Sequence, residues 1–498
     1  MKHDAALPDG SRFTSDADAA FQRARPPVGY FPEPSAPYRQ YRKLAKAMNE
    51  PGLPRTELGA AALSAAFSPA LGARVLMWKQ DPSVGEISAR KVFLPGLILA
   101  GPRDARIVQG QPGIAPVSPN AFGDFVTTPD TPQFDAVHTY AVVRQTLTMY
   151  QRALAAIDDD TPLPWEWNNG ADTGPLEVFP HGLPNVMNAF YSRDQRCLKF
   201  GDFIPTGTEV RVFTCRSFDI VAHETGHAVL DGLKPQWLLA ANPPQTGGLH
   251  EAFGDLTAIF LSLSQLDQCE AIVAQTKARL HDKNFLSDIA EQFGLALGRP
   301  NGLRNADTDI TLSQAGNQVH AISQVFTGAM YDILADLFTL ERRPQVLDDA
   351  DVLHRVGDYL RGLLLRALIA APDFGATYLD VVEAMLDIVA RDGKAQAYAD
   401  AIRTRFSERE VVQLAAGAGQ DAAMAPALAA AVTDQPHAVQ NRRSCCGTMN
   451  LAEYFDVQHD LDAELHALAS WCTAHGRSAR LVPAGAGGPG SNGSRPPQ

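Results

Sequence analysis

The run His223-Glu224-Thr225-Gly226-His227 limits what this chain can be more than any other stretch. Two histidines four positions apart on a helix lie one turn apart on the same face, so both rings can reach one ion. Zinc takes such imidazole nitrogens at about 2.0–2.1 Å. Glu224 directly follows the first histidine, a placement that suits a base taking a proton from a zinc-activated water. The motif therefore predicts a helix with two zinc ligands and a general base.

A third ligand is expected on the next helix, over residues 249–263. Glu251 is the best candidate, 24 positions after His227, and Asp255 lies one turn further on the same face. A carboxylate at Asp255 can accept the second ring N–H of a zinc-bound histidine and fix its tautomer. Two histidines and a glutamate leave one coordination position open, which is typical of catalytic zinc. A solvated helix face is the alternative, but apolar neighbours such as Phe253 favour burial.

The hydrophobic pattern changes character at the motif helix. Before it, strand-like runs stand at 90–100 and 105–109, residues 188–191 and 196–201 suggest a hairpin, and one long helix is expected over 134–154. After it, helical spacing dominates, around 319–339, 352–371 and 376–390. This predicts an α+β fold with a β-rich N-terminal lobe, a helical C-terminal lobe and the motif helix between them.

Five parts follow from this division. They are a partly helical N-terminal extension (1–84), a β-rich lobe ending in the motif helix (85–234), a helical lobe with the third ligand (235–415), a C-terminal extension (416–480) and a tail (481–498). The tail is rich in Gly, Pro and Ser, which predicts disorder.

Composition excludes some classes of function. The formal net charge of −13 argues against a nucleic-acid binder, which needs a basic face. No apolar run approaches the 18 or so residues of a membrane span. The N-terminus has no apolar signal core, so a cytoplasmic location is expected, with export by a non-standard route as the alternative. None of the six cysteines forms a C-x-x-C pair, which favours reduced thiols, although the adjacent Cys445-Cys446 leave a redox or metal role open.

A series of stretches resembles, in the same order, the thermolysin-like zinc metallopeptidases of the gluzincin group. The matching stretches are residues 134–140, 188–191, 203–205, 219–231, 251–255, 303–304 and 318–323. The resemblance spans about residues 130–415. It implies a two-lobe metallopeptidase that hydrolyses peptide bonds with zinc as cofactor and a peptide or protein as substrate.

The resemblance also implies the chemical roles at the centre. His223, His227 and Glu251 would hold zinc, with Asp255 behind them. Glu224 would act as general base and then carry the proton to the leaving amine. A further histidine, His320, would donate a hydrogen bond to the oxyanion. From its residues alone, His320 reads equally well as a capping or core histidine.

Five residues are implied to bind the substrate. Arg304 would bind the carbonyl of the residue after the cut, and Asn188 with Ala189 would hold the peptide backbone. Ile220 and Leu303 would line an apolar pocket, which suggests cleavage before a hydrophobic residue. Taken alone, Arg304 reads as a surface charge and Asn188 as a turn residue.

Departures from the family pattern weaken parts of this picture. The aromatic hydroxyl that assists the oxyanion histidine is replaced by Leu238, and the acid that orients it by Ala315. Losing one such donor costs about 10²–10³ in rate. An acid of the family's calcium site is matched by Asp219 but another is replaced by Ser262, so calcium is not expected. Two alternatives stay open: a weak or inactive peptide-binding protein with the zinc-protease fold, and a structural zinc domain.

Overall fold

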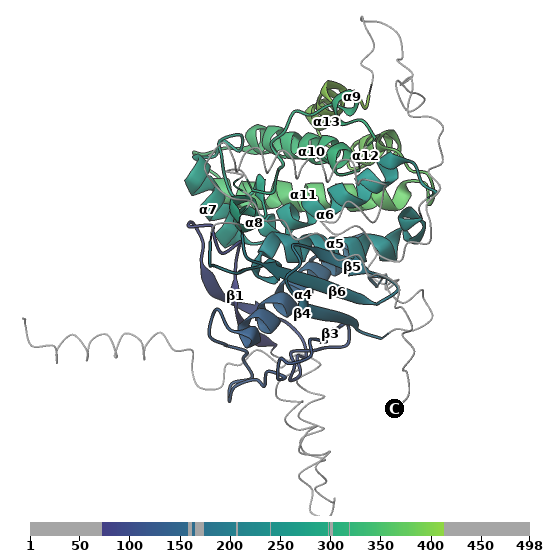
Figure 1. Ribbon diagram of the computed structural model, residues 1–498. Coiled ribbons are helices and arrows are strands. Elements are labelled where there is room, and N and C mark those ends of the chain that lie inside the picture. Colours follow the sequence, from purple (N-terminus) through teal and green to yellow (C-terminus); the bar gives the residue numbers. More distant parts are fainter. Residues whose placement is uncertain are drawn as a thin grey trace, which may run out of the picture. The chain divides into compact units, whose positions relative to one another are not determined.

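The computed structural model describes residues 72–157, 162–164, 174–205, 208–239, 241–296, 298, 302–317 and 319–412. Apart from 95–97, these residues belong to one compact unit. The predicted C-terminal extension, the predicted tail and the Cys445-Cys446 pair lie outside them, as does all but the end of the N-terminal extension. The described part is a mixed α+β structure (Figure 1).

The main sheet lies on the N-terminal side of the motif helix in the chain. Its strands are β3 (Ile107–Gln109), β4 (Leu176–Leu183), β5 (Ala189–Ser192), β6 (Cys197–Phe203) and β7 (Val212–Phe213). Their order is β3-β4-β6-β5, with β7 pairing β6. The predicted hairpin is confirmed, because β5 and β6 pair antiparallel with Ala189 opposite Phe200. A separate antiparallel pair is formed by β1 (Ala73–Trp78) and β2 (Ala89–Leu94).

The long helix α4 (Pro132–Ala155) confirms the expectation for 134–154. Pro132 suits the first turn, where its missing N–H costs nothing. Thr131 caps the helix by accepting a hydrogen bond from the Phe134 N–H at 3.2 Å. The helix packs against α5 (Phe218–Leu233), which carries the motif.

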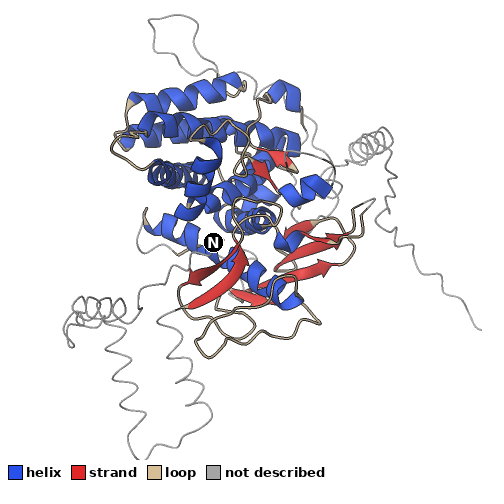
Figure 2. Ribbon diagram, turned by 90° about the vertical axis from the view of Figure 1, so that its left-hand side faces the viewer, coloured by secondary structure: helices blue, strands red, loops and turns tan. Residues whose placement is uncertain are grey.

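The motif helix α5 is buried from Phe218 to Gly232, and the Ser217 hydroxyl caps its start. Figure 1 shows α5 between the main sheet and the helices that follow it in the chain, and Figure 2 shows most strands gathered on one side of the helices. A polar side chain on an enclosed helix costs folding free energy when it has no hydrogen-bond partner. Its histidines and glutamate must therefore be satisfied from neighbouring elements or by a ligand.

Helices dominate the described chain after α5. The elements are η2 (Pro235–Leu238), α6 (Pro244–Leu263), α7 (Leu266–Thr276), α8 (Glu291–Ala296), α9 (Leu312–Ala315), α10 (Val319–Glu341), α11 (Asp349–Ala370), α12 (Tyr378–Arg391) and α13 (Gln396–Glu408), with a small pair β8 (Asp288–Ile289) and β9 (Arg304–Asn305). The helical segments predicted around 319–339, 352–371 and 376–390 are confirmed. No helix within the described ranges has both the length and the apolar character that crossing a bilayer requires.

The start of α6 differs from expectation. The helix expected over 249–263 begins earlier, at Pro244, where a proline fits the first turn. At Gly248 this helix lies so close to Tyr378 that an added Cβ would stand 2.3 Å from the phenolic oxygen, so a side chain does not fit there. The next helix, α7, ends at Thr276, because Lys277 has a left-handed backbone with φ of 51°.

Candidate metal centre

Two glycines let α5 and α6 approach closely. A Cβ on Gly226 would lie 2.6 Å from the Thr257 Oγ1, and a Cβ on Gly254 would lie 2.6 Å from the His223 Cε1. Both distances are far shorter than van der Waals contact, so neither position admits a side chain without movement. The close crossing brings the third predicted ligand of α6 against the two histidines of α5.

The three predicted zinc ligands meet at this crossing. The Nε2 atoms of His223 and His227 each lie 3.5 Å from a different oxygen of Glu251. The three ligand atoms lie within 4.8 Å of one another, and all three side chains are fully buried. Neither Nε2 has a hydrogen-bond partner among the residues that the structure describes. Two imidazole nitrogens and a carboxylate facing one point fit the donor set of a catalytic zinc ion.

Asp255 lies behind His223, as the sequence predicted. Its Oδ1 is 2.9 Å from the His223 Nδ1 and 2.5 Å from the Arg304 Nη2, so it binds both groups. Burial lowers the pKa of His223, but the carboxylates of Asp255 and Glu251 more than offset this and bring the pKa to about 9. A metal at Nε2 would therefore displace a proton.

His227 has a different partner, His250, which the sequence reasoning missed. The two Nδ1 atoms are 2.7 Å apart, and both side chains are buried. Burial lowers the pKa of His227 well below its usual value and the pKa of His250 to about 3, so both rings are neutral. The signal available in the sequence was weak: a histidine directly before Glu251 in an otherwise apolar helix.

The predicted base and oxyanion donor lie at the same centre. Glu224 is fully buried on α5, next to His223 in the chain. His320 opens α10, and its Nε2 is 3.3 Å from the Glu251 Oε2. Burial lowers the pKa of His320, which keeps the ring neutral and leaves it one N–H to donate. Neither ring nitrogen of His320 has a hydrogen-bond partner within the described ranges.

The two departures noted in the sequence remain in the structure. Leu238 ends η2 and is partly buried against the core, and Ala315 ends α9 with 8% exposure. Neither side chain can hydrogen-bond to His320. No acid at position 315 orients this histidine, and the acid nearest to its Nε2 is Glu251.

The proposed substrate-binding residues are mostly enclosed. The Asn188 side chain is 5% exposed, and its Oδ1 accepts the Ala189 N–H at 2.8 Å. Ala189 and Ile220 belong to the core, with 0% and 1% exposure, while Leu303 is partly buried. Arg304 is fixed by Asp255 rather than lying free on the surface. Of these positions, Arg304 is the one that contacts the centre directly, through Asp255 and the His223 Nδ1 at 3.3 Å.

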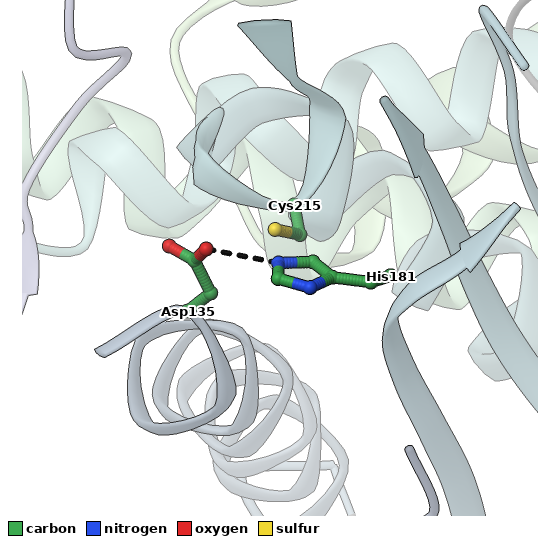
Figure 3. Close-up of side chains that lie close together, drawn as sticks. All are labelled: Asp135, His181 and Cys215. Carbon is green, nitrogen blue, oxygen red and sulfur yellow. Dashed lines mark hydrogen bonds and ion pairs between the residues drawn. The ribbon is translucent and has the colours of Figure 1, made fainter. Parts of the chain in front are cut away.

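A second group of side chains of the kinds that bind metals consists of Asp135, His181 and Cys215. His181 of β4 points at Asp135 of α4, with Cys215 beside them (Figure 3), and the His181 Nε2 is 2.9 Å from the Asp135 Oδ2. The same carboxylate also binds Arg216, whose Nε lies 2.7 Å from Oδ1. Burial raises the pKa of the Cys215 thiol well above its usual value. In this group the Asp135 carboxylate binds both His181 and Arg216. It therefore links α4, β4 and the short helix η1 (Thr214–Arg216).

A third group, His281 with Asp307 and Asp332, is closer to the surface. The Asp332 carboxylate binds the Arg409 guanidinium at 2.8 Å. In the second and the third group, an arginine already binds a carboxylate that a metal ion would need as a ligand. The Glu251 carboxylate faces three histidine Nε2 atoms.

Several acids are buried near the start of α5. Burial and nearby carboxylates, Asp81 first among them, raise the pKa of Asp219 to about 8. Burial also raises the pKa of Asp81 and of Glu291. The Asp219 Oδ2 accepts the Ala290 N–H at 3.2 Å. Ser262 accepts a hydrogen bond from the Gln80 amide at 3.1 Å instead of supplying a further acid.

Comparisons with known proteins place the chain only loosely. No protein-family model and no curated protein matches it. Among solved structures, the precursor of protealysin, a metalloproteinase from Serratia proteamaculans, matches with a TM-score of 0.39 and 13% sequence identity. The match covers 74% of this chain and 97% of that chain. A TM-score of this size adds no weight to the site, whose assignment depends on the geometry above.

Proposed function

We propose that this chain is a zinc-dependent metallopeptidase. The observation that supports it is the convergence of His223, His227 and Glu251 in a buried site, with Glu224 directly beside them. Structural zinc sites use four protein ligands, whereas three ligands with an open position are typical of hydrolases. The paired Nε2 atoms and the carboxylate between them fit the ion without rearrangement of the helices.

In the proposed mechanism, Glu224 carries the proton and neighbouring side chains stabilise the reacting groups. A zinc ion held there would polarise the scissile carbonyl and make a nearby water more acidic. Glu224 takes the proton from the attacking water and delivers it to the leaving amine. His320 donates a hydrogen bond to the oxygen that becomes negative. Asp255 holds the His223 tautomer and anchors Arg304, which we assign to the carbonyl after the cut.

The substrate assignment follows from the surroundings of the centre. Ala189 begins the strand β5 and Asn188 directly precedes it; this strand packs beside α5 and would pair with a peptide backbone. Ile220 lies three residues before His223 and Leu303 directly precedes Arg304, and both are apolar, which favours a hydrophobic residue after the cut. The division of the chain into two lobes is part of the same proposal.

A second candidate is a weak or inactive peptide-binding protein with the same metal centre. The unpartnered ring nitrogens of His320 among the described residues favour it, together with Leu238 and Ala315. An oxyanion donor that no neighbour orients stabilises the developing charge less well.

The test is the variant Glu224→Gln, which keeps the shape of the side chain and removes the base. Zinc content should stay at the wild-type level, while cleavage of a peptide library, read by mass spectrometry, should fall by about 10²–10⁴-fold. Glu177→Gln, on an exposed face of β4, serves as the matched control. Equal cleavage by Glu224→Gln would refute the assignment of the base. Zinc-dependent peptide binding without wild-type cleavage would favour the second candidate.

A further inference from the structure

We propose that His250 positions the metal ligand His227: the His250 Nδ1 accepts the His227 Nδ1–H and holds the His227 Nε2 lone pair toward the ion. This inference rests on the proposed function, since it assumes a metal between His223, His227 and Glu251. The evidence is the contact between the two Nδ1 atoms, which are 2.7 Å apart inside the core.

The two rings are arranged for a hydrogen bond and not for face-to-face stacking. Their centroids are 4.9 Å apart and their planes differ by 29°. The centroid separation exceeds the nitrogen separation by about two ring radii, so His227 and His250 meet edge to edge. This arrangement places the shared hydrogen close to both ring planes, as an N–H···N bond requires.

Such a pair has only two arrangements of its protons. Each neutral imidazole carries one N–H, so one Nδ1 donates, the other accepts, and one of the two Nε2 atoms is left with a proton. Neither Nε2 has a hydrogen-bond partner in the described part of the chain. A metal at the His227 Nε2 decides between the arrangements, because a ligand nitrogen must offer its lone pair. His227 then donates from Nδ1, and His250 keeps its proton on Nε2.

The neutral partner also suits the charge of the centre. His223 has an anionic partner, Asp255, whose charge is balanced by Arg304. The arginine whose charge acts on His250 is Arg193, and its guanidinium is already held by the buried Asp231 carboxylate. A carboxylate at position 250 would therefore add a buried charge next to Glu251, which is costly. An imidazole sets the same tautomer without that charge.

The experiment measures zinc affinity of the full-length protein by competition with a chromophoric chelator. His250→Leu removes the acceptor, and its affinity should fall about 10–100-fold. His250→Asn should stay within about threefold of wild type, because its Oδ1 stands one bond from Cγ, as the histidine Nδ1 does. His354→Leu is the control, since His354 bonds the Leu263 carbonyl at the far end of α6.

Wild-type affinity for zinc in His250→Leu overturns the inference, and so does an equal loss in His250→Asn. If His250→Leu does not fold, nitrogen-15 NMR of histidine-labelled, zinc-loaded wild type decides. We expect a proton on the His227 Nδ1 and on the His250 Nε2, and the reverse pattern at His250 overturns the proposal. Wild type that binds no zinc refutes the proposed function as well, whereas zinc-binding wild type with an indifferent His250→Leu refutes this inference alone.

Discussion

At the scale of single residues, the two histidine ligands differ in what holds their second nitrogen. His223 has the carboxylate of Asp255, and His227 has the imidazole of His250. The outer partner of a metal ligand fixes its tautomer and aim, and its loss weakens binding. The Asp255 carboxylate also neutralises the buried Arg304. It therefore both holds the His223 ring and balances the arginine charge.

The variant Asp255→Asn separates charge from shape at this position. It should lower zinc affinity about 10–100-fold, because the neutral amide oxygen accepts the His223 Nδ1–H more weakly than a carboxylate does and no longer balances the charge of Arg304. Chelator competition measures the effect. Asp373→Asn is the control, since that carboxylate is 76% exposed and pairs with Lys234 at the surface. Unchanged zinc affinity in Asp255→Asn would show that the carboxylate does not support the ligand.

Sequence reasoning predicted the group of residues that meets at the centre but not all of its contacts. His223 with His227, and Glu251 with Asp255, were found because each pair follows from helical spacing within one segment. His250 was not, since its partner lies on another helix at a position that spacing within α6 does not reveal. A contact between two helices depends on their crossing, which the sequence of either helix alone does not give.

At the scale of elements, the centre depends on how closely α5 and α6 cross. Gly254 faces the His223 ring, and an added Cβ would stand 2.6–2.8 Å from three of its atoms. The ring cannot yield freely, because Asp255 holds its Nδ1 and Glu251 lies beside its Nε2. Glycine is therefore needed at position 254 because any side chain would clash with the His223 ring. It is not needed for an unusual backbone conformation.

We expect Gly254→Ala to reduce zinc affinity by more than about tenfold and to lower the free energy of unfolding by about 1–3 kcal/mol, because the helices must separate. Chemical denaturation and chelator competition measure the two effects. Gly362→Ala on α11 is the matched control, with nothing within 4 Å of its added Cβ. That variant should gain about 0.5–1 kcal/mol from helix propensity. A Gly254→Ala protein that behaves like the control would contradict the close crossing.

Elements with strong periodicity were predicted well, and those set by tertiary contact were not. The helices α4, α5 and α10 to α12 follow from their apolar spacing and caps. The first turn of α6 was not predicted as helix, because it is rich in glycine and proline. Gly248 is there because Tyr378 packs against it, which is a contact 130 positions away in the chain.

At the scale of the whole molecule, the candidate metal centre lies where two consecutive helices meet a helix from much later in the chain. α6 packs against both α5 and α10; α5 and α6 carry the proposed zinc ligands, and α10 carries His320. An ion at this point would link α5 and α6 in the folded state only. Binding to the folded state stabilises it in proportion to the logarithm of ligand concentration.

Zinc removal should therefore destabilise the protein. At about 1,000 times the dissociation constant, zinc adds about 4 kcal/mol to the free energy of unfolding. The melting temperature should rise with zinc concentration in wild type and in Glu224→Gln. It should not rise in Glu251→Ala, which lacks a ligand. A zinc-independent melting temperature in wild type would argue against a site formed by the fold.

The buried acids near the start of α5 predict how stability changes with pH. The folded pKa of Asp219, about 8, lies above the unfolded value near 3.9, so the folded state binds more protons between these values. Stability from this group is present below about pH 4 and is lost as pH rises to about 8. Asp219→Asn removes the cost of ionisation, and the variant should exceed wild type by about 2–5 kcal/mol at pH 8 but not at pH 4.

Denaturant unfolding at several pH values measures this difference, with Asp309→Asn at an exposed carboxylate as the control. Calcium, added to wild type at pH 8, tests the expectation that this acidic group does not bind it. If calcium restores the stability that wild type loses between pH 4 and 8, that expectation is wrong, because the ion would be replacing the protons that the buried carboxylates share. If stability is the same at pH 4 and pH 8 in both proteins, Asp219 is already ionised in the folded state. The charge must then be stabilised by hydrogen-bond donors such as the Ala290 N–H, because burial without compensation raises the pKa of a carboxyl.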